Sequence, residues 1–305
     1  MSEKPKLSLV VPVYNEAESL AELHARLTTV LKPLNLSYEI IMVDDGSSDG
    51  SAALIAKLHE ADQRVKLLSF SRNFGHMIAL TAGLDAAHGD AVITLDADLQ
   101  HPPALIPELV RRWQAGAEVV NTLRRGTTGA GPLKKLTAAL FYRLMKMPVN
   151  AADYRLLDRK VVDVLKSVRE RARFLRGLIN WVGFKQEFVE YEADRRFAGW
   201  TKYSFGRMVA FALDGITSFS AVPLRLAAYC GLLSALLGFV YIVYAVYVHF
   251  FTTTTIAGWT SVLVAVLFLG GIQLIFLGVL GEYLGRVFEE TKQRPLYIVS
   301  RRLGL

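Results

Sequence analysis

The chain has 305 residues, a formal net charge of +7 and one cysteine. A single cysteine excludes a disulfide framework within the chain, and no basic run, zinc-ligand spacing or aromatic platform indicates nucleic-acid binding. The length suits one globular domain of roughly 200 residues plus a small second module. The positive charge therefore favours anionic partners, such as a phosphate-bearing substrate or an anionic membrane surface.

The first part of the chain alternates between two periodicities. Short apolar runs predict strands, and apolar residues three and four positions apart predict helices. Strands are expected at 7–12, 38–43, 65–70, 91–95 and 118–121, and helices at 16–31, 49–61, 76–87 and 103–115. This alternation predicts an α/β domain with a mainly parallel, twisted sheet and helices on both faces.

Polar clusters follow four of the predicted strands. The clusters are Tyr14-Asn15-Glu16, Asp44-Asp45-Gly46-Ser47, Arg72-Asn73 and Asp96–Gln100. Each cluster alone is compatible with ordinary turn chemistry, and Ser48-Asp49 is compatible with a helix cap. Ligands of parallel sheets bind beyond the carboxyl ends of the strands. Four clusters at that one edge therefore predict a binding site.

The segment Asp96-Ala97-Asp98 carries two carboxylates at the end of an apolar run. Carboxylates this close raise each other's proton affinity, and a divalent cation removes the repulsion. Mg²⁺ typically takes one or two carboxylates plus phosphate oxygens of a substrate. The segment therefore predicts a site for a metal–diphosphate and a nucleotide-activated substrate. The alternative is a loop with two solvated aspartates. If the Asp-X-Asp tripeptide stood alone, that alternative would be favoured, because the tripeptide is common.

Two long apolar runs, 226–251 and 261–280, lie near the C-terminus. Each exceeds the ~20 residues that cross a bilayer. Between Arg225 and Arg286 there is no Lys or Arg, and Glu282 is the one acidic residue. Basic residues flank the outer ends of both runs, so the positive-inside rule places both termini in the cytoplasm. Cys230 lies in the first run as a small apolar residue. The polar start, residues 1–6, has no signal-peptide pattern.

The segment 203–219 is largely apolar and has Lys202 and Arg207 at its start. It is too polar to span a membrane, yet it precedes a predicted span. The pattern predicts an interfacial helix that lies along the membrane surface. The alternative is a core helix of the globular domain.

Several motifs resemble known enzymes. VVPVYNE (10–16), VDDGSSD (43–49) and LDADLQHPP (95–103) resemble family 2 glycosyltransferases of the GT-A fold. DYRLL (153–157), RFAGWTKYS (196–204), PLR (223–225) and LGEYLGR (280–286) resemble the polyprenyl-phosphate subgroup, which contains dolichol-phosphate mannose synthases, bactoprenol glucosyltransferases and undecaprenyl-phosphate aminoarabinose transferases. Two spans and the pattern at 150–153 are most similar to the bactoprenol glucosyltransferases. The resemblance covers nearly the whole chain.

The resemblance implies an enzyme that transfers a sugar, with inversion, from a nucleotide sugar to undecaprenyl or another polyprenyl phosphate. The favoured donor is UDP-glucose, so glucose is the sugar expected to be transferred. It also implies a bacterial plasma-membrane protein with a cytoplasmic GT-A domain at 1–200, an interfacial helix and linker at 201–225, a transmembrane hairpin at 226–285 and a cytoplasmic tail at 286–305. The hairpin could support a homo-oligomer, and no nucleic-acid partner is expected.

The resemblance gives roles to residues at the predicted sheet edge. Asp98 and Gln100 become direct metal ligands, with Asp96 on the metal or on the donor ribose and sugar. These hard oxygen ligands suit Mg²⁺ or Mn²⁺, which acts as a Lewis acid on the leaving diphosphate. Donor-nucleotide binding is assigned to Pro12, Tyr14, Glu16, Asp44 and Asp45. For Pro12 and Tyr14 the alternative is simple packing at a strand end.

The acceptor nucleophile is a phosphate oxygen that is already mostly ionised, because its second pKa is ~6. A strong base is therefore not required, but cations must hold two anionic substrates together. The candidates are Arg124, Arg125, Arg196, Lys134, Lys135 and Lys202, of which Arg124 and Arg196 best match the family's phosphate-binding positions. A solvated or lipid-facing basic surface is the alternative for the two adjacent lysines.

Asp153 matches the position that the family treats as catalytic base. Its expected role is either base or orienting group for the acceptor. The alternative is a structural ion pair with Arg155 or another nearby arginine.

Other functions stay open from the sequence. The sugar could be aminoarabinose-type from UDP or mannose from GDP. A processive polysaccharide synthase would carry more spans and a Gln-X-X-Arg-Trp segment, whereas Arg112-Trp113 is preceded by Leu109-Val110-Arg111. A membrane nucleotide-sugar sensor or a flippase would not need both Asp153 and the phosphate-binding arginines. Product analysis would separate these alternatives.

Overall fold

The computed structural model describes residues 5–125, 151–171, 173–192, 222–251 and 258–305. The chain divides into two compact units. The first, the sheet unit, comprises Met1–Ala210 and Arg294–Leu305, and the second, the hairpin unit, comprises Phe211–Gln293. The predicted interfacial helix at 203–219 lies outside the described residues, as do Lys134, Lys135, Arg196 and Lys202.

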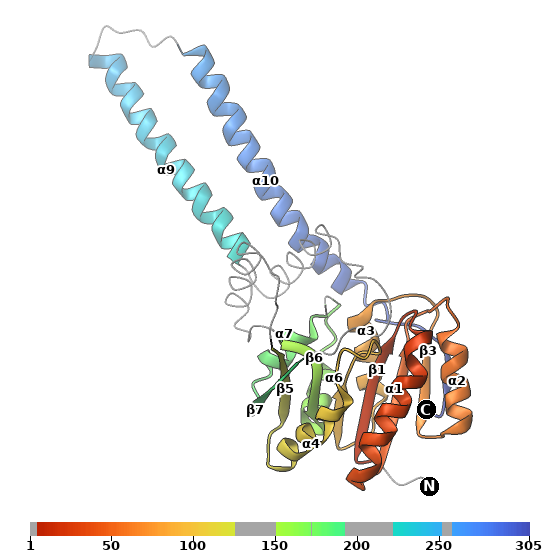
Figure 1. The fold of residues 1–305 in the computed structure, drawn as a ribbon. Coiled ribbons are helices and arrows are strands. Elements are labelled where there is room, and N and C mark those ends of the chain that lie inside the picture. Colours follow the sequence, from red (N-terminus) through yellow and green to blue (C-terminus); the bar gives the residue numbers. More distant parts are fainter. Residues whose placement is uncertain (1–4, 126–150, 172, 193–221, 252–257) are drawn as a thin grey trace. The chain divides into compact units, whose positions relative to one another are not determined.

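The sheet unit is built on one mixed sheet of eight strands in the order β7-β5-β6-β4-β1-β2-β3-β8 (Figure 1). The strands are β1 Leu7–Val13, β2 Tyr38–Asp44, β3 Val65–Phe70, β4 Ala91–Thr94, β5 Val119–Arg124, β6 Ala151–Asp158, β7 Gln186–Tyr191 and β8 Val299–Leu303. Strands β6 and β8 run antiparallel to their neighbours, and the other pairings are parallel. The prediction of a mainly parallel sheet is confirmed.

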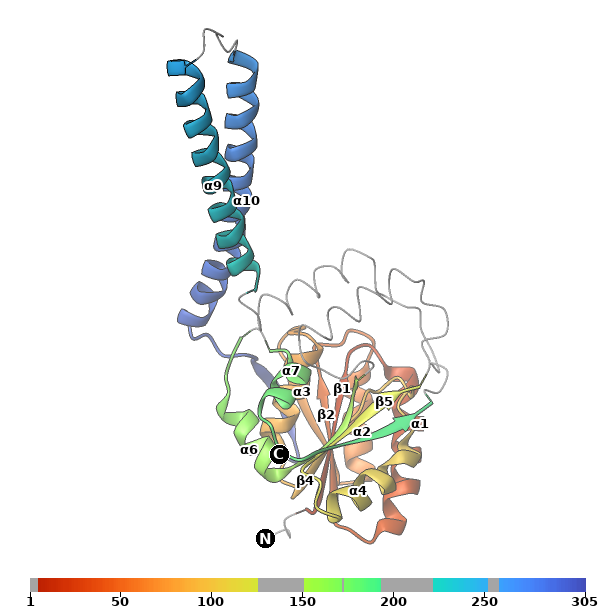
Figure 2. The same cartoon turned by 90° about the vertical axis from the view of Figure 1, so that its left-hand side faces the viewer.

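Helices cover both faces of the sheet, as predicted (Figure 2). Helices α1 (Ala17–Leu31), α2 (Ser51–Ala61) and α4 (Ile106–Gln114) pack together on one face, and α3 (His76–Ala86), α6 (Arg159–Ser167) and α7 (Leu175–Trp181) are linked by contacts on the other. Short 3₁₀ turns, η1 at Lys32–Leu34 and η2 at Pro103–Leu105, complete the unit.

Strand β1 lies at the centre of the sheet and is buried along its whole length. Leu7 and Leu9 belong to the same buried cluster as Leu20 and Leu27 of α1, so this face of β1 packs under the helix. The opposite face carries Val10. A Cβ on Gly83 of α3 would lie 2.1 Å from Cγ1 of Val10, so glycine is required for α3 to approach the sheet this closely.

The sequence predicted β1 to β5 but not the last three strands. In β6 the charged Asp153 and Arg155 interrupt the apolar pattern, although both side chains are buried in the structure. Strand β8 is an edge strand with exposed arginines, so it has no apolar period to read. It pairs antiparallel with β3, and the predicted tail therefore ends as part of the sheet.

The hairpin unit contains α9 (Val222–Phe251) and α10 (Trp259–Thr291), which contact each other. Each has a window long and apolar enough to cross a membrane, Leu224–Tyr241 and Phe268–Thr291, and neither window is buried. The predicted apolar runs at 226–251 and 261–280 fall within these helices.

Candidate active site

The first two polar clusters are joined by hydrogen bonds at the edge where β1 and β2 end. Asn15 has a positive φ of 54°, and its Oδ1 accepts from the backbone N–H of Ser48 at 2.8 Å. The N–H of Asn15 donates to Oγ of Ser47 at 3.0 Å. Pro12 is buried and pairs in register with Val43 of β2. The loops that follow β1 and β2 are therefore connected to each other.

Tyr14 and Glu16 flank Asn15 in the loop that follows β1. The Tyr14 side chain is exposed, whereas Glu16 is half-buried. The backbone N–H of Glu16 donates to Oγ of Ser51 at 3.1 Å, which ties the start of α1 to the start of α2. An exposed aromatic ring beside a fixed backbone is compatible with contact to a base or ribose.

Asp44 and Asp45 are both buried, and their carboxylates bind strand β3 and the loop before α3, respectively. Asp44 Oδ2 accepts from Oγ of Ser69 at 2.6 Å. Asp45 accepts from the backbone N–H groups of Phe74 at 2.6 Å and Gly75 at 2.9 Å. Burial raises the pKa of Asp45, although these two N–H donors oppose that change. The pair thus ties the end of β2 to β3 and to the start of α3.

Gly46 follows this pair and has a positive φ of 70°. A Cβ there would lie 2.5 Å from the carbonyl carbon of Arg72. Both the backbone angle and the close approach require glycine. The second and third polar clusters therefore meet directly.

The Asp96–His101 turn follows β4. Leu99 has a positive φ of 63°, and the N–H of Gln100 donates to Asp98 Oδ1 at 3.1 Å. The N–H of Asp96 donates to Nδ1 of His101 at 3.0 Å. His101 is buried and stacks on Tyr154 with ring centroids 5.1 Å apart. The turn is thereby fixed to strand β6.

The donor set of this turn fits a divalent metal ion. Asp96, Asp98 and Gln100 supply two carboxylates and one amide oxygen, which are the hard ligands that Mg²⁺ and Mn²⁺ prefer. Asp96 Oδ1 is buried and accepts no hydrogen bond. Among the described residues no three His, Cys, Asp or Glu side chains form a complete metal cluster. Mg²⁺ sites of this kind usually take phosphate oxygens of the substrate as well.

Asp153 lies on β6, which pairs antiparallel with both β4 and β5. Its carboxylate is buried and forms a bidentate pair with Arg176 of α7, with Nε–Oδ1 at 2.7 Å and Nη2–Oδ2 at 2.5 Å. Nη2 of Arg155 lies 3.3 Å from Oδ1. Burial alone would raise the pKa of Asp153, but the charge and hydrogen bonds of Arg176 outweigh it and hold that pKa well below its ordinary value.

Arg155 is buried beside Asp153 and also donates to the carbonyl of Ala152 at 2.6 Å. Burial lowers the pKa of Arg155 to about 10, so the guanidinium keeps its charge near neutral pH. The ion pair that the sequence left as an alternative for Asp153 is thus present, and Arg176 joins it.

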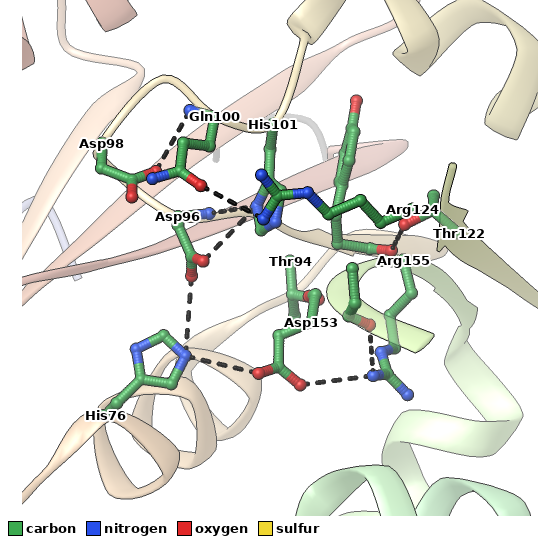
Figure 3. Close-up of polar contacts among 12 residues, drawn as sticks. His76, Thr94, Asp96, Asp98, Gln100, His101, Thr122, Arg124, Asp153 and Arg155 are labelled. Atoms are coloured by element: carbon green, nitrogen blue, oxygen red, sulfur yellow. Dashed lines mark hydrogen bonds and ion pairs between the residues drawn. The ribbon is translucent and has the colours of Figure 1, made fainter. Parts of the chain in front are cut away.

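His76 connects the predicted metal turn with Asp153 (Figure 3). Its Nε2 lies 3.5 Å from Asp96 Oδ1 and 3.8 Å from Asp153 Oδ2. Burial alone would lower the pKa of His76, but Asp153 and Asp96 outweigh that effect and raise it. One imidazole nitrogen therefore lies between the carboxylates of two predicted site motifs.

Arg124 ends β5 with an exposed side chain, and its Nη1 lies 3.5 Å from Oε1 of Gln100 (Figure 3). The pKa of Tyr191, at the end of β7, responds to several charges of the candidate site. Burial raises the pKa of Tyr191 to about 12, and the charges of Arg124, Asp96, Asp98 and Arg176 also act on it. The Tyr191 ring is buried and lies 6.1 Å from the ring of His101, the last residue of the turn.

Sequence reasoning missed His76, Arg176 and Tyr191. His76 begins α3 directly after the Arg72-Asn73 cluster, so its place beyond a strand end was a usable signal. Arg176 lies in an apolar segment with buried Leu175 and Leu178. A charged residue among buried neighbours indicates that an oppositely charged side chain is close in the fold, but the sequence does not show which one. Tyr191 had no signal in the sequence.

Comparison with known proteins identifies the family. The description "Glycosyl transferase family 2" matches residues 8–165, and "GtrB C-terminal hairpin" matches residues 222–287. The Bacillus subtilis protein named "Uncharacterized glycosyltransferase YkcC" is 47% identical and covers 100% of this chain and 96% of its own length. The Escherichia coli protein named "Prophage bactoprenol glucosyl transferase homolog" is 43% identical and covers 97% of this chain and 99% of its own length.

Solved structures with a similar fold include the mannosyltransferase PcManGT from Pyrobaculum calidifontis in complex with GDP-Man and Mn²⁺. It has a TM-score of 0.49 and 17% identity, and covers 73% of this chain and 65% of its own. The two family matches together cover the sheet unit from β1 into α6 and most of the apolar hairpin. This chain is a member of glycosyltransferase family 2, an enzyme of the GT-A fold that carries a GtrB-type C-terminal hairpin.

Proposed function

We propose that this enzyme transfers glucose from UDP-glucose to a polyprenyl phosphate, with inversion at the anomeric carbon. The observation that carries the proposal is similarity over 97% of the chain, hairpin included, to a protein named as a bactoprenol glucosyl transferase homolog. The Asp96–Gln100 turn at the sheet edge supplies the oxygen ligands that a metal–diphosphate donor needs. The apolar hairpin suits an enzyme with a lipid acceptor.

In the proposed reaction a phosphate oxygen of the lipid attacks C1 of the sugar. A phosphate-oxygen-to-C1 bond forms while the bond from C1 to the diphosphate oxygen breaks, and UDP leaves with the electron pair. Asp98, Gln100 and Asp96 would hold a divalent metal ion that neutralises charge on the leaving diphosphate. The nucleotide would be positioned by Pro12, Tyr14, Glu16, Asp44 and Asp45, which lie at the adjoining ends of β1 and β2.

The acceptor phosphate needs cations rather than a strong base, because it is already mostly ionised at neutral pH with a second pKa of ~6. Arg124, whose Nη1 lies 3.5 Å from Oε1 of Gln100, is proposed for this role. Arg196, Lys135 and Lys202 stay predictions for the same task. Asp153 stays the proposed orienting group or base at the edge formed by β4, β6 and β5.

Mass spectrometry of the lipid product tests this function. Purified protein is incubated with undecaprenyl phosphate, Mg²⁺ or Mn²⁺ and, separately, UDP-glucose, other UDP-sugars and GDP-mannose. We expect one hexose on the lipid with UDP-glucose, a β-linkage by NMR, and no product in EDTA. A polymeric product, or transfer from GDP-mannose alone, would contradict the proposal.

We also propose that the sheet unit and both termini are cytoplasmic. The support is the absence of Lys and Arg between Arg225 and Arg286 and their abundance outside that interval. In a variant with Cys230 replaced, a cysteine at Thr253 should react with an impermeant thiol reagent added outside the cell. A cysteine at the exposed Ser300 should react only after the membrane is opened. Labelling of both positions from outside would overturn the orientation.

A further inference from the structure

A compact cluster of one acidic and two basic side chains lies beside the Asp96–His101 turn, where the metal is proposed to bind. Its members are Asp153, Arg155 and Arg176. Both carboxylate oxygens of Asp153 are bound by Arg176, and Arg155 contacts the same carboxylate. Two guanidinium charges against one carboxylate give the cluster a formal charge of +1. A buried acid in this arrangement is part of a cationic site, because its own charge is more than compensated.

Exposure is unequal within this cluster. The side chains of Asp153 and Arg155 are 7% and 4% exposed, whereas that of Arg176 is 24% exposed. An anion that approaches from solvent therefore meets Arg176 before it meets the carboxylate. Arg176 binds Asp153 through two nitrogens, a planar bidentate geometry that fixes the direction of the guanidinium.

The cluster borders the proposed transfer site. Asp153 Oδ2 lies 3.8 Å from Nε2 of His76, and the same nitrogen lies 3.5 Å from Asp96 Oδ1. Two side chains thus separate Arg176 from the turn that would hold the donor diphosphate. Arg124, at the end of β5, lies beside Gln100 of that turn, and the charges of Arg124 and Arg176 both act on Tyr191. The acceptor phosphate must reach this region to attack the sugar.

We propose that Arg176 binds the acceptor phosphate and that Asp153 is its positioning residue rather than a proton acceptor. This inference rests on the proposed transfer to a polyprenyl phosphate. No proton needs to move in that reaction, since the phosphate attacks as an anion. A carboxylate bound on both oxygens by one arginine and contacted by a second is poorly suited to receive a proton, but well suited to aim a guanidinium.

The first test compares Arg176→Gln and Arg176→Lys with the control Arg169→Gln. Arg169 also forms an Arg–Asp pair, at 2.7 Å from Asp85, but that pair lies outside the proposed site. The KM for undecaprenyl phosphate should rise about 10- to 100-fold in Arg176→Gln and less in Arg176→Lys, which keeps the charge but loses the fork. It should stay unchanged in Arg169→Gln.

Affinity for the donor shows whether a variant is still folded, so it distinguishes a specific loss of acceptor binding from a general loss of folding. UDP-glucose binding is measured by calorimetry with Mg²⁺ present and lipid absent, and we expect it to change less than about twofold in each variant. A fall in kcat with an unchanged acceptor KM in both Arg176 variants would overturn the inference. So would a loss of donor affinity in Arg176→Lys as large as its loss of transfer.

The second test is a double-mutant cycle with Asp153→Asn. If Asp153 acts through Arg176, the double variant should be about as slow as Arg176→Gln alone, because coupled residues are not additive. Multiplicative losses would make Asp153 an independent base and overturn the inference. Direct binding of undecaprenyl phosphate to wild type and Arg176→Gln, without donor, distinguishes the two proposals. Normal lipid binding without transfer by wild type would refute only the proposed function.

Discussion

The sheet unit and the hairpin unit use the same apolar residue types in opposite ways. Leu9 and Leu27 of the sheet unit are fully buried, whereas Leu232 and Leu274 of the hairpin are 70% and 71% exposed. Burial of apolar surface is the main favourable term in folding in water. The sheet unit therefore carries its own core, while the hairpin leaves large apolar side chains exposed, as expected of a segment that meets lipid.

Polar groups show the complementary difference. The sheet unit buries charges such as Glu39 and Asp153 and pairs them, with Lys66 for the former and arginines for the latter. In the described part of α10, Glu282 pairs with Arg286 near the end of the apolar window. The comparison places the paired buried charges of the proposed site in the sheet unit, and the exposed apolar surface proposed to contact a membrane in the hairpin.

The largest expected effect comes from Asp98→Asn. Loss of one anionic ligand should lower the transfer rate by about 10²-fold or more, as for other groups that stabilise transition-state charge. Membrane association should stay at the wild-type level, because the hairpin is unchanged. Transfer is measured with labelled UDP-glucose, and membrane association by carbonate extraction. Near-normal turnover, or full wild-type activity in EDTA, would break the assignment of the metal site.

Leu236→Lys tests the hairpin half of the comparison. Leu236 is 58% exposed, so in water the change would cost little. In the middle of a bilayer it should cost about 3 kcal/mol of insertion free energy. The inserted fraction is measured in a membrane-insertion assay. The control Val164→Lys, at an exposed position of α6, should change stability by less than about 0.5 kcal/mol. Equal, small effects would mean that the hairpin lies in water.

A smaller effect is expected from Trp113→Phe in the sheet unit. Nε1 of Trp113 donates to Asp158 Oδ2 at 2.7 Å, and Asp158 also caps α6. Loss of this bond should lower the free energy of unfolding by about 1 kcal/mol. Thermal unfolding in detergent measures the change. The control Arg26→Gln removes an exposed pair with Glu22 and should have less than half that effect. An equal loss in both variants would contradict this ranking.

The smallest expected effect is that of Asp153 on the pH dependence of transfer. The pKa of Asp153 lies well below its ordinary value. A lowered pKa stabilises the fold above the ordinary value of ~3.9, and that contribution is lost only as the pH falls through the lowered pKa. Between about pH 5 and 8, kcat/KM should therefore follow the acceptor phosphate, with a pKa of ~6. An acidic limb that disappears in Asp153→Asn would show a titrating base.

The sequence patterns predicted the elements whose burial shows in a short stretch of consecutive residues. The apolar runs that became β1 to β5 were readable because every central strand is covered on both faces. The Asp96–Gln100 turn was readable because it directly follows such a run. The two apolar helices were readable because their length alone separates them from ordinary core helices. Family resemblance then supplied the reaction and the role of Asp153.

Tertiary structure decided which distant residues share the site. Insertion of antiparallel β6 between β4 and β5 brings Asp153 beside the Asp96 turn, and the starts of α3 and α7 add His76 and Arg176. The edge strand β8 likewise found β3 only in the folded chain. Periodicity records whether a side chain is buried, not which strand it will face. Strand order and charge pairing are set by long-range packing, so only the fold could reveal them.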